Sequence, residues 1–471
     1  MRPRQGKKGL LMLVMAFMMV VMAACGGGSS NSNSAENQTS ETQQEVTSDN
    51  ENKDSTSSAP VTLTFAMQAN ANEIAGWTAM IDAANKKLKA DGKNITIKIE
   101  KINTSTWPEY YQKVTAQIAA GKSPDLGRIA ESFMPQIIKK DQALDITEMM
   151  KSLDMSKYFE NTFKNAGYQD GKYYGLPSGI YYMLMYYNKD MFKAKGIAEP
   201  SHDWNNAISF SQVRDIAKQF TSGEGSKKTF GLSAGPFLSY AGGMFSLSNG
   251  GKNIFNEDLT PAIQEPATKE VYQWFDDMLR VDKSVPRPTD TKIMGGFDMF
   301  KAGRIAMAID GTWYIGSVKN DIKNFNVGIA AIPAGKGQAY SSQFIDNFLI
   351  WKGTKHPQES WEALQAIYSK EAWDALAKTG VGGLPIHRET FDEIKQSLFG
   401  DKISAEDLDT FTKALDHTVS VPYNAFYEEA DQKINAQLDT WLLGKMSVDE
   451  FLTKSTQILL ETKEKTEQKA N

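Results

Sequence analysis

Apolar and polar positions alternate after about residue 60 with two different periods. Residues 61–67 (VTLTFAM) and 95–100 (ITIKIE) alternate at every second position, as half-buried strands of a sheet do. Between and after them, apolar residues recur at helical spacing, and Pro108 stands where the first turn of a helix accepts proline. This pattern predicts helices at 74–90 and 106–121. Strands that alternate with helices indicate an α/β fold with a largely parallel sheet.

The segment 175–192, GLPSGIYYMLMYYNKDMF, is the most apolar and aromatic stretch of this region. It opens with a Gly-x-Pro turn and ends at the polar residues 188–190, ahead of another predicted helix. A run this short, bounded by turn residues, predicts a buried strand rather than a membrane element. Its many tyrosines leave two interpretations open, because a buried hydroxyl needs a partner while an exposed ring can stack on a polar, ring-shaped ligand.

The remaining pattern continues in the same way to the C-terminal region. Short strands are predicted at 127–130, 305–309, 328–333 and 344–351. Helices are predicted at 209–220, 268–283, 297–304, 356–378, 392–398, 405–415, 428–443 and 447–463. The glycine-rich segments 240–245 and 381–385 are expected to form turns.

Polar and aromatic residues follow two of these strands. Glu131 and Ser132 stand at the end of strand 127–130, and Trp313 comes after Gly311, directly beyond strand 305–309. Ligands of open α/β sheets bind outside the carboxyl ends of the strands, so these side chains are candidate contacts. The alternatives are that the first two cap a helix or lie in a solvated loop, and that Trp313 is a core residue at a helix start.

The first 24 residues have the pattern of a secretion signal. Four basic residues precede the apolar run 10–21, which is short for a stable membrane span, and small residues lead to Cys25. The sequence Met-Ala-Ala-Cys-Gly resembles a bacterial lipobox, in which the cysteine is acylated after cleavage. Cys25 is the only cysteine, so no intramolecular disulfide can form. We expect a signal peptide at 1–24 and lipidation at Cys25; the alternative is an ordinary export signal with a free thiol.

Residues 26–59 are rich in Ser, Asn, Gln, Thr and Glu and contain no aromatic residue. Such a segment buries too little apolar surface to offset its ordering entropy, so we expect disorder. As a flexible coil it would span about 30 Å. With a lipid at one end and a folded part at the other, residues 25–59 are predicted to be a tether.

Size and charge narrow the class of protein further. The remainder, about 410 residues, exceeds one ordinary core, so two lobes are expected. Without the four basic residues of the signal, 48 basic residues oppose 57 acidic ones, a formal charge of −9. This balance argues against nucleic acid and against an anionic membrane surface as partners, because both require a basic face.

Signals for enzyme chemistry are weak. The four histidines have no zinc-ligand spacing, and neither a Walker phosphate loop nor a Gly-x-Ser-x-Gly elbow occurs. We therefore expect no catalytic residue, no metal and no cofactor. An extracellular glycoside hydrolase remains the main enzyme alternative; it needs two carboxylates across a sugar site, for which Glu131 and Asp346 are the available pair.

Four segments together resemble the extracellular solute-binding proteins of bacterial ABC importers, in the maltose and oligosaccharide branch (family 1). They are Tyr111-x-Lys113 leading to Ala119-Ala-Gly121-x-x-Pro124-Asp125; Gly175-Leu-Pro177 running to Tyr187-Asn188-Lys189-Asp190; Phe300-x-x-Gly303-Arg-Ile-Ala-Met307 followed by Gly311-x-Trp313; and Trp351 to Trp361 with Lys355-His356-Pro357. Their order and spacing span essentially the whole chain.

The resemblance implies two α/β lobes joined by strand crossings at a hinge, with the solute in the cleft between them. Lobe one would be residues 60–178 plus 341–385, and lobe two 179–340 plus 386–471. The segment 175–192 would then begin at a hinge crossing. The family mechanism is hinge closure around the solute and presentation of the closed form to a membrane permease.

The resemblance also implies contact residues and partners. Glu131 and Ser132 fall on first-lobe contacts, Tyr181 on the central strand, and Trp313 on the family's stacking aromatic. Weaker placements are Tyr240, Asp346, Asn424 and Phe426. The implied function is a monomeric, lipid-anchored receptor on the outer face of the bacterial cell membrane, which binds a sugar or oligosaccharide for an ABC permease. A surface lipoprotein that senses solute without feeding transport shares the fold and remains an alternative.

Overall fold

The computed structural model describes residues 59–68, 73–104, 106–380 and 383–468. These belong to one compact unit, residues 57–471. The predicted signal peptide, Cys25 and almost all of the predicted tether lie outside the described residues. Within the described part, no helix is both long and apolar enough to cross a membrane.

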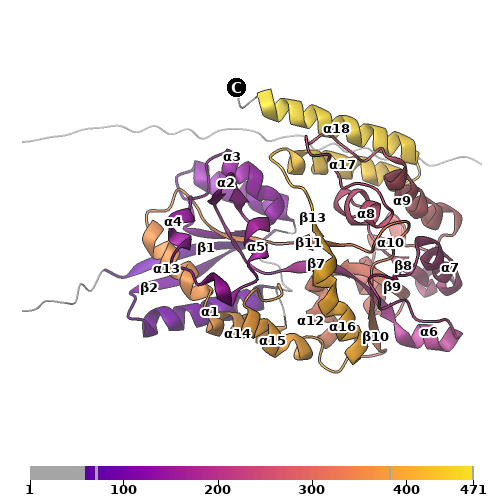
Figure 1. Cartoon of the computed structure of the whole chain (residues 1–471), viewed down its shortest axis with the longest axis horizontal. Helices are drawn as coiled ribbons and strands as arrows, with labels where there is room; N and C mark the ends of the chain where they lie inside the picture. Colours follow the sequence, from indigo (N-terminus) through magenta and orange to yellow (C-terminus); the bar gives the residue numbers. More distant parts are fainter. Residues whose placement is uncertain (1–58, 69–72, 105, 381–382, 469–471) are drawn as a thin grey trace, which may run out of the picture. The chain divides into compact units, whose positions relative to one another are not determined.

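The first of two main sheets contains the N-terminal strands, and Figure 1 shows it with its covering helices. β1 (Val61–Gln68) lies between β2 (Ile95–Ile102) and β3 (Leu126–Ile129) and pairs with both in parallel. β12 (Asn347–Ile350) and β6 (Leu176–Pro177) extend it in antiparallel pairing. The predicted alternation of strands and helices is thus confirmed here.

Eight helices accompany this sheet in the chain. They are α1 (Ile74–Ala90), α2 (Trp107–Ala119), α3 (Met134–Lys139), α4 (Thr147–Met150), α5 (Asn161–Asn165), α13 (Pro357–Ile367), α14 (Lys370–Thr379) and α15 (Arg388–Ile394). α1 packs on β2, α13 and α14, which burial of one apolar face of an amphipathic helix predicts. A two-stranded sheet, β4 (Tyr168–Gln169) with β5 (Lys172–Tyr173), lies apart from both main sheets.

The second main sheet is built around β7 (Tyr181–Asn188), every residue of which is buried. β7 pairs antiparallel with β9 (Ile305–Gly311), β10 (Val327–Ala330) and β11 (Ser341–Phe344). The outer strands are β8 (Phe230–Ser233) and β13 (Thr418–Ser420). The helices in this part of the chain are α6 (Lys189–Lys195), α7 (Phe210–Phe220), α8 (Ser246–Ser248), α9 (Pro266–Asp276), α10 (Pro288–Thr291), α11 (Gly296–Lys301), α12 (Ile315–Asn320), α16 (Ala405–Lys413), α17 (Tyr427–Leu442) and α18 (Val448–Gln468).

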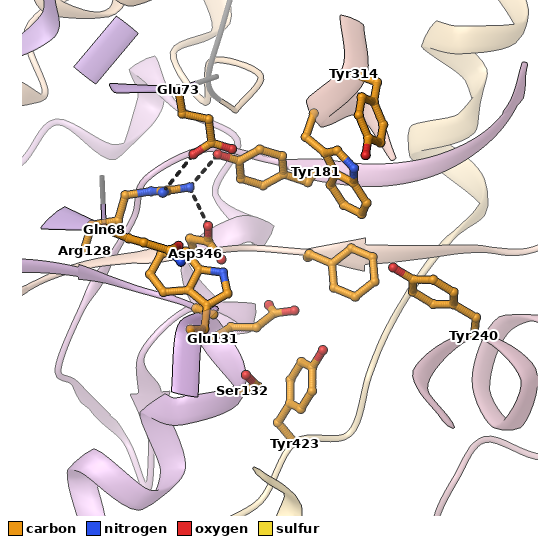
Figure 2. A pocket seen from close by; sticks show the side chains of 14 residues that line it. Gln68, Glu73, Arg128, Glu131, Ser132, Tyr181, Tyr240, Tyr314, Asp346 and Tyr423 are labelled. Atoms are coloured by element: carbon orange, nitrogen blue, oxygen red, sulfur yellow. Dashed lines mark hydrogen bonds and ion pairs between the residues drawn. The ribbon is translucent and has the colours of Figure 1, made fainter. Parts of the chain in front are cut away.

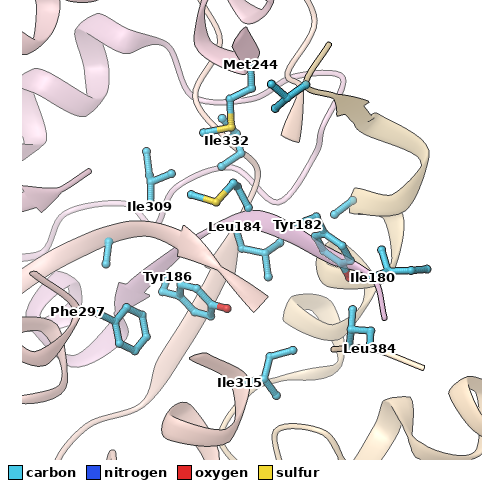
Figure 3. Close-up of a cluster of buried hydrophobic side chains, with 14 of the residues drawn as sticks. Ile180, Tyr182, Leu184, Tyr186, Met244, Phe297, Ile309, Ile315, Ile332 and Leu384 are labelled. Atoms are coloured by element: carbon cyan, nitrogen blue, oxygen red, sulfur yellow. The ribbon is translucent and has the colours of Figure 1, made fainter. Parts of the chain in front are cut away.

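The tyrosines of β7 serve mainly as core residues whose hydroxyls are satisfied (Figure 3). Tyr182 donates to the carbonyl of Phe411 at 2.9 Å, and Tyr186 to the carbonyl of Gly311 at 3.1 Å. Buried phenols with partners contribute large apolar area without an unpaired polar atom. The core interpretation thus holds for Tyr182 and Tyr186. Tyr181, at the start of the strand, lines a cavity, and its contact with a ligand stays a prediction.

The chain passes between the two sheets at two neighbouring places. Residues 178–180 connect β6 to β7, and the backbone N–H of Ser178 donates to the carbonyl of Asp346, between β11 and β12, at 2.7 Å. Ile180 exchanges two backbone hydrogen bonds of 3.0 Å with Leu384. A Cβ atom at Gly179 would lie 2.8 Å from the Cα of Gly383, so this close approach of backbones requires glycine.

Three predicted elements are wrong in detail. The predicted strand 344–351 is two strands in different sheets, because Ile345 and Asp346 form the crossing between β11 and β12. The predicted helix 356–378 is two helices, since the Ser369 hydroxyl caps α14 by accepting from the N–H of Ala372. The expected turn at 240–245 is a π-helix, η4 (Tyr240–Phe245).

The limits of the two lobes given in the sequence analysis remain a prediction, but the strand pairing favours two changes to them. β11 pairs with β7 and β13, so the sheets favour residues 345–346, rather than 341, as the start of the return to lobe one. α15 packs on α14, and the Arg388 side chain donates to the carbonyl of Tyr158 at 2.7 Å. We therefore propose that the last lobe limit lies after α15 rather than at 385.

Candidate functional site: a cavity between the two sheets

A cavity of about 430 Å³ lies where the two sheets meet, beside the strand crossings. Its volume is within the usual range for small-molecule sites. The lining residues come from both sheets and from the crossings between them (Figure 2): Gln68, Glu73, Trp107, Arg128, Ala130, Glu131, Ser132, Tyr181, Tyr240, Trp313, Tyr314, Phe344, Asp346 and Tyr423.

Aromatic rings form the side of the cavity that belongs to the second sheet. Trp313 lies in the short helix η6 (Thr312–Tyr314), directly after β9, with its ring centroid 6.3 Å from Tyr181 and 5.9 Å from Phe344. Tyr240 continues the row, 6.0 Å from Phe344. Tyr240 is the first residue of η4, and π-helical turns of this kind are frequent at functional sites. The rings offer stacking surfaces to a flat or partly apolar ligand.

A buried arginine organises the opposite, polar side. Arg128 on β3 is only 3% exposed, and its guanidinium donates to Asp346 at 2.5 Å, to Glu73 at 3.1 Å and to the Tyr181 hydroxyl at 2.7 Å. Its Nε donates to Ser178 at 3.3 Å, so every partner except Glu73 lies at a strand crossing. Burial raises the pKa of Asp346 to about 6, against the opposing effect of the Arg128 charge.

The rings of Trp77 and Trp107 pack against the guanidinium group of Arg128. The guanidinium carbon of Arg128 is 4.4 Å from the ring centroid of Trp77 and 5.2 Å from that of Trp107. A desolvated cation over an aromatic face is stabilised by the ring quadrupole. The arrangement keeps Arg128 charged and its hydrogen-bonding geometry fixed.

Glu131 contributes a carboxyl oxygen that accepts no hydrogen bond from the described residues. It begins the short helix η1 (Glu131–Phe133), is 8% exposed, and its Oε2 accepts from the N–H of Ile345 at 2.8 Å. Oε1 is buried and has no hydrogen-bond partner among the described residues, and Figure 2 shows the carboxyl group directed into the cavity. Burial raises the pKa of Glu131 well above its ordinary value, and the nearby charge of Asp346 adds to the effect.

Two contacts connect the parts across the edge of the cavity. The Ser132 side chain lies beside Glu428 of α17; burial raises the pKa of Glu428 to about 7, and Ser132 opposes this rise. Farther out, the Nζ of Lys139 donates to the carbonyl of Thr466 in α18 at 2.8 Å. Both contacts join the first-sheet part to the C-terminal helices.

Six of the eight residues proposed from the sequence line this one cavity: Glu131, Ser132, Tyr181, Tyr240, Trp313 and Asp346. Asn424 and Phe426 do not. Phe426 is buried against Phe255 with ring centroids 5.6 Å apart, and the Oδ1 of Asn424 accepts from the N–H of Phe426 at 3.1 Å. The loop instead presents Tyr423 to the cavity.

Sequence reasoning missed Arg128, the centre of the polar side. Its signal was available, because a lone charged residue interrupts the apolar strand Leu126–Ile129, and a charge buried in a strand needs a partner. Glu73, Trp107 and Phe344 gave no comparable signal, since their patterns fit ordinary helix and strand positions. In the described part of the chain, no cluster of three or more potential ligands could hold a metal ion.

Residues 79–396 match the model of a family described as bacterial extracellular solute-binding protein. The chain belongs to this family. A Brucella abortus (strain 2308) protein described as a binding protein is 26% identical over 399 residues, covering 83% of this chain and 93% of that protein. Members of the family are binding proteins rather than enzymes, which confirms the expectation that the chain is not an enzyme.

Solved structures agree on the fold. The ABC substrate-binding protein Lmo0181 from Listeria monocytogenes, in complex with cycloalternan, superposes with a TM-score of 0.74 at 20% identity, over 85% of this chain and 98% of that one. The maltose-bound MalE3 of T. maritima superposes with a TM-score of 0.69 at 15% identity. The match covers 84% of this chain and 98% of that one. The two-lobed periplasmic-binding-protein fold expected from the sequence is thus confirmed for this solute-binding protein.

We expect Arg128→Ala to lower the free energy of unfolding by about 3–5 kcal/mol, because it leaves Glu73 and Asp346 partly buried without their shared cation. Chemical denaturation without ligand measures this. The control is Lys151→Ala, which removes an ion pair whose two side chains are more than two-thirds exposed and should change stability little. Equal stability of the two variants would contradict the structural role assigned to Arg128.

The buried carboxyl of Glu131 makes stability depend on pH in a defined direction. Its folded pKa lies above its unfolded pKa, so between the two values the folded protein binds a proton that the unfolded chain does not, and stability falls as pH rises. Glu131→Gln removes this charge and keeps an oxygen for the N–H of Ile345. We expect the variant's melting temperature to exceed that of the wild type by more at about pH 8 than at about pH 5. A difference in melting temperature between variant and wild type that stays constant or shrinks with rising pH would refute the prediction.

Proposed function

We propose that this chain is a lipid-anchored extracellular receptor of an ABC importer that binds a sugar or oligosaccharide in the cavity and delivers it to a membrane permease. The observation that carries the proposal is the pairing of an aromatic wall, Trp313, Phe344 and Tyr240, with a polar wall around Arg128 and Glu131. Sugar rings have apolar faces that stack on aromatics and hydroxyls that need hydrogen-bond partners. The family and the saccharides named for the structural neighbours support the same class.

The charges of the cavity favour a neutral saccharide. Among its described lining residues the only cation is Arg128, and its guanidinium is engaged by Asp346, Glu73 and the Tyr181 hydroxyl. Glu131 adds a further carboxyl. A uronate or phosphorylated sugar would therefore bring its charge to a site with no free counter-charge, which costs binding energy. Sugar hydroxyls, by contrast, can donate to the free Oε1 of Glu131.

The proposed mechanism is closure about the strand crossings. Saccharide that contacts both walls binds the closed arrangement better than an open one, and this difference in affinity drives closure. The proposed ligand contacts are Glu131, Ser132, Tyr181, Tyr240, Trp313 and Asp346. The contacts of Ser132 with Glu428 and of Lys139 with Thr466 form only when the two parts are close, so they belong to the form presented to the permease.

We propose that Cys25 carries the lipid and that residues 26–59 tether the folded part outside the cell membrane. The lipobox-like sequence and the absence of any second cysteine support this assignment. The tether's length allows the folded part to reach solute and permease while it stays attached.

A thermal-shift screen of residues 60–471 against neutral mono- and oligosaccharides tests the binding function. A ligand at about 100 times its Kd stabilises the native state by about 2.7 kcal/mol, so a matching saccharide raises the melting temperature. Trp313→Ala should weaken binding about tenfold or more, and Trp313→Phe, which retains a ring, should weaken it less. Sugar recovered unchanged excludes hydrolysis. Larger shifts with phosphorylated or acidic sugars would contradict the proposed class.

Cys25→Ser tests the attachment. In a bacterial host the wild-type chain should sediment with membranes and enter detergent extracts, whereas the variant should appear in the soluble or secreted fraction. Incorporation of labelled palmitate into the wild type but not the variant measures acylation directly. Membrane association that persists in Cys25→Ser would show that another segment holds the protein there.

A further inference from the structure

A second cavity, of about 380 Å³, adjoins the first on the side of the second sheet. The two share Tyr240 and Tyr314 as lining residues, so these two side chains stand at their junction. Figure 2 shows both at the end of the first cavity away from Arg128. The second cavity is therefore a direct neighbour of the first, with these two side chains between them.

Its position fits a ligand site of an α/β sheet. The floor is formed by Ser233 and residues 234–237, which follow β8, and by Asp310 at the end of β9. β8 and β9 are parallel, so their carboxyl ends meet at one edge, where open sheets of this type bind ligands. Side chains of α17 and of the segment around α10 close the other sides.

The lining has the same chemistry as the first cavity. Phe237 is 45% exposed, with its ring perpendicular to that of Tyr240 at a centroid distance of 5.5 Å. Phe297 stacks on Tyr314 at 3.8 Å, which fixes the Tyr314 ring at the junction. Among the described lining residues there is no lysine, arginine or histidine, while Asp310 and Asp439 are acidic, so this cavity too disfavours an anionic ligand.

Asp310 lies near the junction of the two cavities. Its carboxyl accepts from the N–H of Gly311 at 2.8 Å. Burial raises the pKa of Asp310 to about 7, and the neighbouring Trp313 side chain, the stacking residue of the first cavity, opposes this rise. Asp310 thus lines the second cavity within three residues of Trp313, which lines the first.

We propose that the second cavity is a further subsite of the same site, which binds the distal rings of a saccharide chain too long for the first cavity. The proposal rests on the proposed function. A linear saccharide that stacks on Trp313 leaves the first cavity between Tyr240 and Tyr314 and meets the exposed face of Phe237 next. The receptor therefore prefers longer neutral oligosaccharides to the disaccharides of the same series.

Titration calorimetry on the full chain tests this with linear glucose-, mannose- and galactose-based oligosaccharides of two to seven rings. Affinity should rise with length in the series that binds. Phe237→Ala should lower affinity for the longest members about tenfold and leave the two-ring members unchanged. Phe237 is largely exposed, so its loss should not impair folding. Tyr168→Ala, which removes a similarly exposed ring outside both cavities, is the matched control. It should change neither the affinity for the longest members nor that for the two-ring members.

A second variant blocks the cavity instead of removing a contact. Thr291 is exposed and lines it, so Thr291→Trp should fill the space and reduce long-chain affinity only. The inference is overturned if long and short members bind equally, or if both variants leave long-chain affinity unchanged, or if Tyr168→Ala lowers it as much. In those cases saccharide still binds and the proposed function stands. Absence of binding to any saccharide overturns both proposals.

Discussion

The buried guanidinium of Arg128 is the interaction on which the centre of the molecule depends. It extends from a strand of the first sheet into the region where the chain crosses to the second, and its partners Ser178, Tyr181 and Asp346 belong to two separate crossings. A buried cation is stable only with such partners, and buried carboxylates only with such a cation. The group therefore sets where the two sheets meet, and the cavity forms beside it.

The division of the cavity into a polar and an aromatic wall follows from the same constraint. Asp346 approaches Arg128 from a crossing and Glu73 approaches it from the start of α1, which places both carboxylates around the same guanidinium. In the second sheet, Tyr182 and Tyr186 of the central strand are buried in the core, where their hydroxyls donate to backbone carbonyls. The cavity is lined instead by residues at strand ends, such as Trp313 after β9, and by residues of short helices, such as Tyr240.

Much of the fold could be predicted because its cause is local. The helix 74–90 and the strand 61–67 follow from periodicity and turn residues, and the structure has them within one residue at either end. The strand 344–351 could not be predicted correctly, because its interruption at Ile345 and Asp346 is imposed by distant residues, Glu131 and Ser178. Their places after predicted strands, and then the family positions, indicated Glu131 and Trp313. Arg128 was missed because its burial inside a strand, and hence its need for charged partners, was not considered.

The closeness of the two strand crossings has a mechanical consequence. Rotation of one lobe about the crossings moves each group in proportion to its distance from that axis. In the proposed closure, Arg128 has a short lever arm, because Ser178 and Asp346 lie at the crossings themselves, and we expect its salt bridge to Asp346 to persist. Lys139 and Thr466 are joined by one exposed hydrogen bond that involves neither crossing. Opening would break that exposed contact and spare the buried ones at the crossings.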